Sequence, residues 1–318
     1  MRRRGLLALL APLTAGCLGG VEVSRQGEQS APADGGQAPT NESTTTATPA
    51  PTTPDQSESV ASDRQAAARR LRVAGDRLRE AVSAYAGTAS VADVTADDEF
   101  VARDVYVSLV GASGAVEEAR ALAATDDQTE RATALSGVVA FLSHATAGQA
   151  AMGAGHDALL SVPAALRSGD VSRARAVVDG LGADRREAEQ AASLVRSEST
   201  ESDVETTAVV ADDGRRLKLA QFDAAVVALD DAVRPVRALV DGVERLVDAR
   251  AAAAADDGDE ATSLASDAER TLEDAETDLS GLADSLPAAA APFADAADTL
   301  ADYAAARDDE AADVRRGY

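Results

Sequence analysis

The feature that most constrains the fold of this chain is an apolar stripe in its second half, spaced by steps of three and four residues. This spacing continues over almost four heptads, so the side chains fall on one narrow face of a helix, as in a coiled-coil seam. Pro235 lies inside the stripe, and we expect it to kink the helix rather than end it, because the pattern continues beyond it. The stripe consists of Phe222, Val226, Leu229, Val233, Val236, Val240, Val243 and Val247.

Weaker stripes of the same period predict helices through most of residues 60–318. Residues 62–65 read Ser-Asp-Arg-Gln, a capping box that is expected to start the first helix. A second helix is predicted over about 97–124. A third is predicted to start at a capping box at 125–128 and to end at Pro163.

Small and acidic residues mark the expected turns. Asp170 follows a tight turn and is expected to cap the next helix. The glycines at positions 180 and 182 are expected to break that helix, with Asp184 restarting it. Residues 256–260, Asp-Asp-Gly-Asp-Glu, are expected to form a later turn.

These patterns predict an all-α fold, because alternating β-branched runs closed by Asn-Gly or Asp-Gly do not occur. Helices of this length make an elongated antiparallel helical bundle, either one bundle or two end to end. The periodicity fades between about 198 and 214 into a loop or frayed helix. We therefore expect a first half at 60–200 and a second half at 201–318.

Residues 26–59 have the composition of a tether. They are rich in Ser, Thr, Pro and Gly, and nothing apolar recurs that could repay the entropy of ordering them. Such Ser/Thr/Pro-rich segments are typical of glycosylated stalks. Asn41 begins an Asn-Glu-Ser sequon and is a candidate for N-glycosylation. The sequence therefore predicts a disordered stalk.

The first twenty residues indicate export. Three arginines precede an apolar run at 6–13, and small residues lead into Cys17, the only cysteine in the chain. The run is too short to span a bilayer. The segment Leu-Thr-Ala-Gly-Cys resembles the lipobox of secreted lipoproteins, which implies a signal peptide at 1–16 and a lipid-anchored N-terminus at 17–25, held in membrane lipid through Cys17. The arginines are also similar to a twin-arginine signal, and the choice between that export route and the general one stays open.

The charge balance is strongly acidic, with 55 acidic against 30 basic residues and a net charge of −25. Lys218 is the only lysine, so the other basic residues are arginines. Such acidic, lysine-poor, alanine-rich chains resemble proteins of extremely halophilic archaea, which implies folding at molar salt, where screening suppresses self-repulsion. The charge excludes a nucleic-acid-binding function, which needs a basic patch.

The sequence offers few residues for chemistry. His144 and His156 are twelve residues apart, so a straight helix places them too far apart to share a metal. The acidic clusters at 97–99, 126–127 and 256–260 match no calcium-loop spacing and are interpreted as helix-start carboxylates. No nucleophile elbow, phosphate loop or dinucleotide motif occurs. We therefore expect no catalytic, cofactor-binding or metal-binding residues and no enzymatic activity.

The leading hypothesis is a lipid-anchored, extracytoplasmic helical bundle at the cell membrane, facing the exterior, with a binding, spacing or structural role. Its partner would be an unidentified envelope or membrane protein. The alternative is a ligand-sensing or solute-binding helical module, in which Phe141, Met152 and Phe222 would line a pocket rather than fill the core. An enzyme would need a site that periodicity does not reveal.

Overall fold

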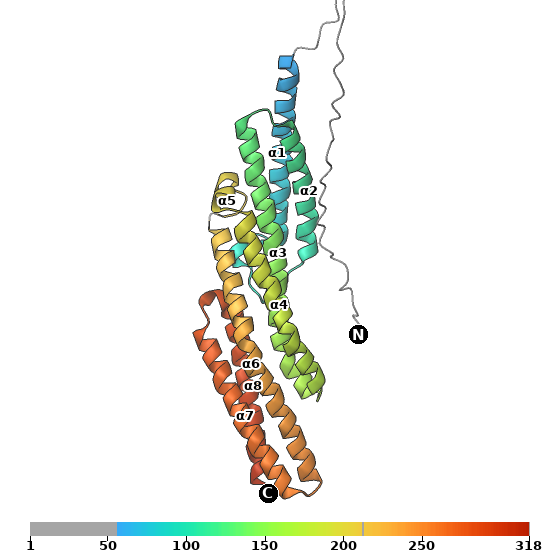
Figure 1. Ribbon diagram of the computed structural model, residues 1–318, viewed down its shortest axis with the longest axis vertical. Coiled ribbons are helices and arrows are strands. Elements are labelled where there is room, and N and C mark those ends of the chain that lie inside the picture. The colour runs from blue at the N-terminus through green and yellow to red at the C-terminus, as the bar shows by residue number, and fades with distance from the viewer. Residues whose placement is uncertain (1–55, 212, 318) are drawn as a thin grey trace, which may run out of the picture. The chain divides into compact units, whose positions relative to one another are not determined.

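The computed structural model describes residues 56–211 and 213–317, and these residues are almost entirely helical (Figure 1). They contain no strand, so the prediction of an all-α fold is confirmed. The predicted signal peptide, the lipidation site and most of the stalk lie outside the described residues. The elements are α1 (Gln56–Ala86), η1 (Val91–Asp93), α2 (Ala102–Leu122), α3 (Asp126–Arg167), α4 (Val171–Glu198), α5 (Glu201–Thr207), α6 (Gly214–Ala254), α7 (Gly258–Ser285), η2 (Ala288–Ala290) and α8 (Ala291–Arg316).

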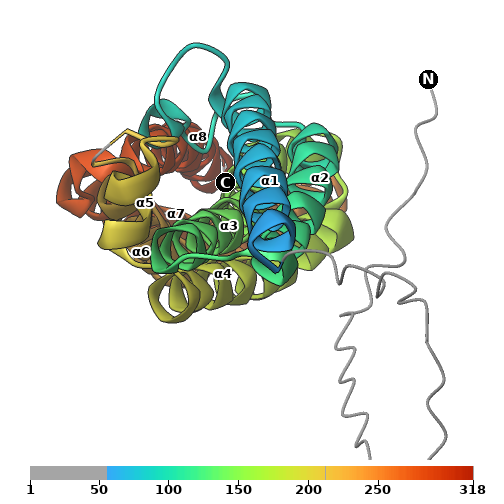
Figure 2. The same cartoon turned by 90° about the horizontal axis from the view of Figure 1, so that it is seen from above.

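The long helices alternate in direction along the chain and pack against their neighbours in sequence (Figure 1). Helices α1 and α2 pack beside the first half of α3, and α7 and α8 pack beside α6. Helices α3, α4 and α6 join these two groups, as the view from above also shows (Figure 2). The helical region forms one compact unit, so the halves predicted at 60–200 and 201–318 both lie within it.

One continuous apolar core runs through the helical region, from α1 to α8. Two glycines of α3 let α6 approach closely. A Cβ atom on Gly148 would lie 2.7 Å from the ring of Phe222, and one on Gly155 would lie 2.7 Å from a methyl group of Leu229. The absence of a side chain at these two positions is therefore what allows the large side chains of α6 to pack against α3.

The seam predicted on α6 is buried over most of its length. Phe222, Leu229, Val236, Val240 and Val243 are buried, and the helix runs without interruption through Pro235. Val226 and Val233 are only half-buried, and Val247 is 46% exposed. A second row of buried residues accompanies the seam, because α6 packs against α4 as well as against α7 and α8. This row includes Ala225, Ala228, Ala232, Leu239, Leu246 and Ala249.

Two predicted starts are wrong. Helix α1 begins at Gln56, so the residues at 62–65 lie inside the helix and form no capping box, and the end of the predicted tether is helical. The alanine-rich segment that follows favours an uninterrupted helix. Helix α2 begins at Ala102 rather than at 97, because residues 95–98 form a turn in which Asp98 accepts a hydrogen bond from the amide of Thr95 at 2.7 Å.

Two predicted interruptions are also wrong. Helix α3 continues through Pro163 to Arg167, and the proline ring is buried, so packing compensates for the lost hydrogen bond. Helix α4 continues through Gly180 and Gly182. A glycine costs a helix only about 1 kcal/mol, and the buried Leu181 between the two glycines holds this turn against its neighbours. The predicted restart at Asp184 therefore does not occur.

Other turns follow the sequence prediction in full or in part. Asp170 caps α4 by accepting a hydrogen bond from the amide of Arg173 at 2.9 Å. Thr125 caps α3 by accepting from the amide of Gln128, but the Gln128 side chain bonds the amide of Ala124, so the predicted reciprocal box does not close. The region predicted as a loop or frayed helix at 198–214 contains the short helix α5.

Arginine side chains connect neighbouring helices at the surface. Along the boundary between α4 and α6, Arg175 pairs with Asp241 and Glu244, and Arg196 pairs with Asp223. Further pairs link the same two helices and join α6 to α7, α6 to α8 and α7 to α8; they are Arg185–Asp230, Arg237–Asp179, Arg234–Asp278, Arg250–Glu310 and Arg315–Glu269. The planar guanidinium can bind two carboxylate oxygens at once, which suits arginine rather than lysine to this role.

Candidate functional site

The most unusual site in the described structure surrounds Lys218, the single lysine of the chain, which α6 places fully inside the fold. Its ammonium nitrogen Nζ donates three hydrogen bonds, to the backbone oxygen of Val94 at 2.7 Å, to Oε1 of Gln149 at 2.5 Å and to Oε1 of Gln221 at 2.8 Å. An ammonium group has three hydrogens to donate, so its hydrogen-bonding capacity is used completely.

The two glutamines extend this network to the segment that connects α1 to α2. Nε2 of Gln149, on α3, donates to the backbone oxygen of Thr95 at 2.6 Å. Nε2 of Gln221, on α6, donates to the backbone oxygen of Ala92 at 2.6 Å. Together with Lys218 they bind three carbonyl groups of the segment at 92–95, so one buried cluster ties this segment to α3 and α6.

Two aromatic rings lie beside the ammonium group. Nζ of Lys218 lies 5.4 Å from the ring centre of Tyr85 and 5.6 Å from that of Phe222, within the range of cation–π attraction. The hydroxyl of Tyr85 donates to the backbone oxygen of Ala145 at 3.3 Å, and its ring meets the edge of Phe100. Burial raises the pKa of Tyr85 well above 10.

Burial also determines the charge state of the lysine. Loss of water around the ammonium group lowers the pKa of Lys218 from 10.5 to about 7, and the carboxylate of Asp98 opposes this shift. A lysine with such a pKa could act as a base or a nucleophile if a substrate reached it. Here the nitrogen is enclosed, and in its protonated form it donates all three hydrogens to protein oxygens, so the arrangement serves to hold the backbone of residues 92–95.

Sequence reasoning did not identify this site, although one signal was present. Lys218 stands alone among the basic residues, all of which are otherwise arginine. A compact ammonium group can satisfy three carbonyl oxygens that converge on one point, whereas a planar guanidinium cannot. The two glutamines could not have been recognised, since they lie 72 positions apart by their numbers, 149 and 221, and only the fold brings them together.

The residues singled out from the sequence do not converge. Cys17 and Asn41 lie outside the described residues. His144 bonds the carboxylate of Glu198 through Nε2 at 2.9 Å, at the surface between α3 and α4. His156 is buried beside the ring of Phe293, and its Nδ1 has no hydrogen-bond partner among the described residues. The two histidines therefore occupy separate places.

Two of the acidic clusters lie at helix starts, as interpreted from the sequence, but the cluster at 97–99 lies in a turn that ends before α2 begins at Ala102. Asp97 and Asp98 accept hydrogen bonds from the hydroxyl of Thr95 at 2.5 and 3.0 Å. Asp126 and Asp127 lie in the first turn of α3. The turn predicted at 256–260 is shorter, because Gly258 to Glu260 form the start of α7, which Asp257 caps by accepting from the amide of Glu260 at 3.2 Å. Among the described residues, no three His, Cys, Asp or Glu side chains are grouped so that they could hold a metal ion.

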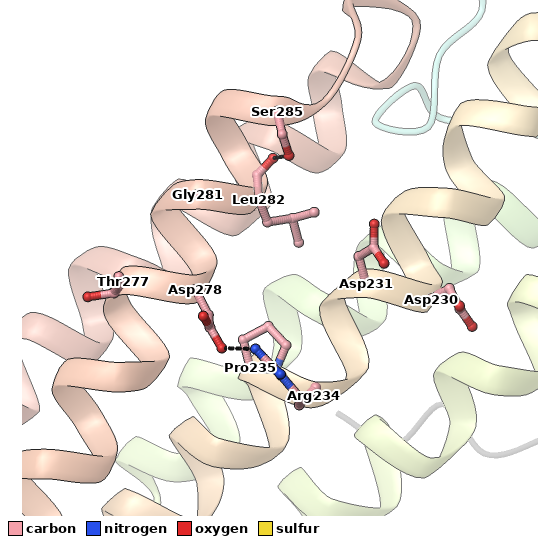
Figure 3. Close-up of a pocket in the computed structure, with 9 residues that line it drawn as sticks. All are labelled: Asp230, Asp231, Arg234, Pro235, Thr277, Asp278, Gly281, Leu282 and Ser285. Atoms are coloured by element: carbon pink, nitrogen blue, oxygen red, sulfur yellow. Dashed lines mark hydrogen bonds and ion pairs between the residues drawn. The ribbon is translucent and has the colours of Figure 1, made fainter.

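The large side chains considered as pocket-lining residues lie in the core. Phe141, Met152 and Phe222 are buried in the continuous apolar cluster. Hollows occur instead at the surface. One lies between α6 and α7, where Arg234 pairs with Asp278 at 2.6 Å (Figure 3). It is shallow and mixed in character, with the side chain of Leu282 facing the ring of Pro235 (Figure 3).

A second hollow borders the buried lysine cluster. It is formed by residues 96–100 and by α3, and Gln149 contributes to its wall. Its rim carries Asp97, Asp98, Glu99 and Asp157, so the hollow is acidic. Lys218 lies behind Gln149 and is not among the residues that line it.

The described helices and the comparisons with known proteins give two further findings. None of the helices in the described part of the chain combines the length and apolar character needed to cross a membrane. No protein-family model, no curated protein and no solved structure matches the chain.

Proposed function

We propose that this chain is a lipid-anchored helical module, held in the cell membrane through Cys17 and carried towards the exterior on the stalk at 26–59, where it binds or spaces components of the cell surface. The proposal joins three features of different origin: the lipobox-like segment, the Ser/Thr/Pro-rich tether and the helical region. Its partner would be an envelope or membrane protein.

The filled interior of the helical region is the observation that carries the binding or spacing role. Large side chains of α6 pack directly onto glycines of α3, as Phe222 does against Gly148, and leave no space between these helices for a ligand. The polar cluster at Lys218 is closed by its own hydrogen bonds. A bundle filled in this way presents its outer surface to partners, and its long helices resist bending.

The acidic surface supports the assignment to a high-salt environment. Many carboxylates on the helices have no cationic partner available, since acidic residues outnumber basic ones by 55 to 30. At molar salt the Debye length is about 3 Å, so this repulsion is screened. We infer that the protein folds and works in concentrated salt, as proteins of halophilic archaea do.

Membrane fractionation tests the proposal. The full chain and a Cys17→Ser variant are produced in a halophilic host, and their distribution between membranes and medium is compared. The proposal requires that the parent chain partitions with membranes and that Cys17→Ser appears in the medium or accumulates as an unprocessed precursor. A processed Cys17→Ser chain that remains with membranes to the same extent would contradict anchoring through this residue.

A further inference from the structure

Helix α2 has the composition of a central helix but lies at the edge of the helical region. Residues 105–116 contain no charged side chain, although 27% of the chain is charged. Helix α2 packs chiefly against α1 and α3, and it lies on the outside of the bundle in the view from above (Figure 2). The segment contains Ser108 and Ser113, but a helix with so few polar side chains is normally covered on most of its surface.

The uncovered face of α2 is apolar and is continuous along the helix. Val107 is 67% exposed and Val110 is 74% exposed, the two largest values among the exposed large hydrophobic residues. Gly114 follows four residues after Val110, and a Cβ atom placed on it would meet no atom within 4 Å. At 100° per residue, these three positions fall within one stripe opposite the buried residues Val105, Ala112, Val116 and Ala119.

Opposite charges lie at the two ends of this face. Arg103 precedes the stripe on the same side of the helix, and Glu117 and Glu118 follow it. The exposed Asp104 lies beside Arg103 but about 100° further round the helix, off the stripe. Glu118 pairs with Arg70 of α1 at 2.6 Å. The side chains of Arg103 and Glu117 have no ion-pair or hydrogen-bond partner within residues 56–211 and 213–317. Along the stripe the face therefore carries an arginine at one end, apolar residues in the middle and glutamates at the other end.

We propose that this face binds a second copy of the same chain, with the two α2 helices packed antiparallel about a two-fold axis near Val110. A two-fold axis there superposes each end of the face on the opposite end of the other copy. Arg103 then lies beside Glu117 of the partner subunit, and Val107 lies over the open space at the partner's Gly114. A pattern that complements itself under a two-fold rotation is what an isologous dimer requires.

The pattern favours a second copy over the other occupants of an apolar helix face. A face that is positive at one end and negative at the other has no net attraction for an anionic lipid surface. Gly114 also has no side chain, and a Cβ atom on it would meet nothing within 4 Å; small residues of this kind allow two helices to approach closely.

Disulfide trapping tests the pairing directly, because the chain has a single cysteine. In a Cys17→Ser background, Val110→Cys is introduced near the proposed axis and the full chain is oxidised gently in molar salt. The control is Val227→Cys, at an exposed position of α6 with 51% exposure. A covalent dimer is expected with Val110→Cys and not with Val227→Cys.

Mixed oxidation tests the direction of the helices. Chains with Val107→Cys are mixed with chains with Gly114→Cys, which are expected to form a disulfide-linked heterodimer. Val107→Cys alone is expected to form little covalent dimer, since an antiparallel pair separates its two copies by about seven residues, or ~10 Å. Trapping of Val107→Cys with itself in preference to the mixture would overturn the antiparallel arrangement.

Sedimentation of the untrapped chain measures the association itself. Val110→Asp is expected to raise the dimer dissociation constant about tenfold or more, because it places a carboxylate in the centre of the contact. Val227→Asp should leave the constant unchanged, and circular dichroism should show that both variants keep their helices. A parent chain that is monomeric throughout, or equal effects of the two variants, would overturn the proposal. It would also be overturned if Val110→Asp altered only the binding of the chain to lipid vesicles.

Discussion

Nζ of Lys218 lies 2.5 Å from Oε1 of Gln149, although 69 residues separate them in the chain. The contact joins α6 to α3 at the level where the segment between α1 and α2 crosses both helices. Because the same ammonium group also bonds the backbone of Val94, it fixes three parts of the fold at one point. Arginines pair with carboxylates at the surface, whereas the single lysine is buried.

Replacing this lysine is expected to destabilise the fold. Lys218→Met removes three donors and leaves the oxygens of Val94, Gln149 and Gln221 without them, and each buried orphaned oxygen costs about 1–3 kcal/mol. Denaturant unfolding at about pH 6 in molar salt, where the amine is protonated and donates all three hydrogens, should show a loss within or above this range. The matched control is Arg216→Met, two positions earlier and exposed, which should change the free energy of unfolding by less than about 0.5 kcal/mol. Equal effects would refute a structural role for the cluster.

Stability should rise with pH above about 7, and Lys218 should be the cause. Its pKa is about 7 in the folded chain and 10.5 when it is exposed, so between these values the unfolded chain holds one more proton than the folded chain. The free energy of unfolding then increases with pH by at most about 1.4 kcal/mol per unit. Below pH 7 both states are protonated and this contribution is constant.

Thermal unfolding of the parent and of Lys218→Met between about pH 6 and pH 9.5 measures this effect. The parent should gain stability across the upper part of this range, while Lys218→Met should lack that gain. If the two chains respond to pH in parallel, the lysine does not carry the linkage.

Replacing two helical glycines, Gly148 and Gly180, with alanine should change the stability of the fold in opposite directions. A Cβ atom on Gly148 would meet the ring of Phe222 at 2.7 Å, so Gly148→Ala should destabilise the fold by about 1–3 kcal/mol through overpacking. A Cβ atom on Gly180 would meet nothing within 4 Å, and Gly180→Ala should stabilise α4 by up to about 1 kcal/mol. The melting temperatures of both variants in molar salt decide the matter, and a loss of stability in Gly180→Ala would contradict the continuous α4.

The fold should depend steeply on salt. The net charge is −25, and the range of electrostatic repulsion grows from about 3 Å at 1 M salt to about 10 Å at 0.1 M. Far-UV circular dichroism should show a loss of helix on dilution and its recovery when salt is restored. A chain that is equally helical and compact at both salt concentrations would argue against the halophilic assignment.

The sequence predicted what depends on local periodicity. The stripe from Phe222 to Val247 predicted a long helix with a face that is buried over most of its length, and Asp170 predicted a helix start, because both signals act within a few residues. The errors occurred where tertiary packing overrides a local signal. Pro163 and the glycines at 180 and 182 read as breaks, yet buried neighbours hold the helix through them. Val247 has the spacing of the stripe but is exposed, because the spacing alone does not show where along α6 the neighbouring helices stop covering it.

The lysine cluster could not be predicted, for a different reason. Its members come from α3, α6 and the segment at 92–95, and no spacing in the sequence relates Gln149 to Lys218. Hydrogen bonds between distant elements depend on how the helices are arranged in space. The exposure of Val107 and Val110 on α2 could not be predicted either, since the apolar pattern of a helix does not show how many of its faces other helices cover.

The most direct test of the proposed function is the mass of the N-terminal peptide of the chain extracted from membranes. The mature chain is expected to begin at Cys17, to lack residues 1–16 and to carry the added mass of a lipid on the cysteine. A chain that retains residues 1–16, or one that begins elsewhere with Cys17 unmodified, would contradict anchoring through this residue.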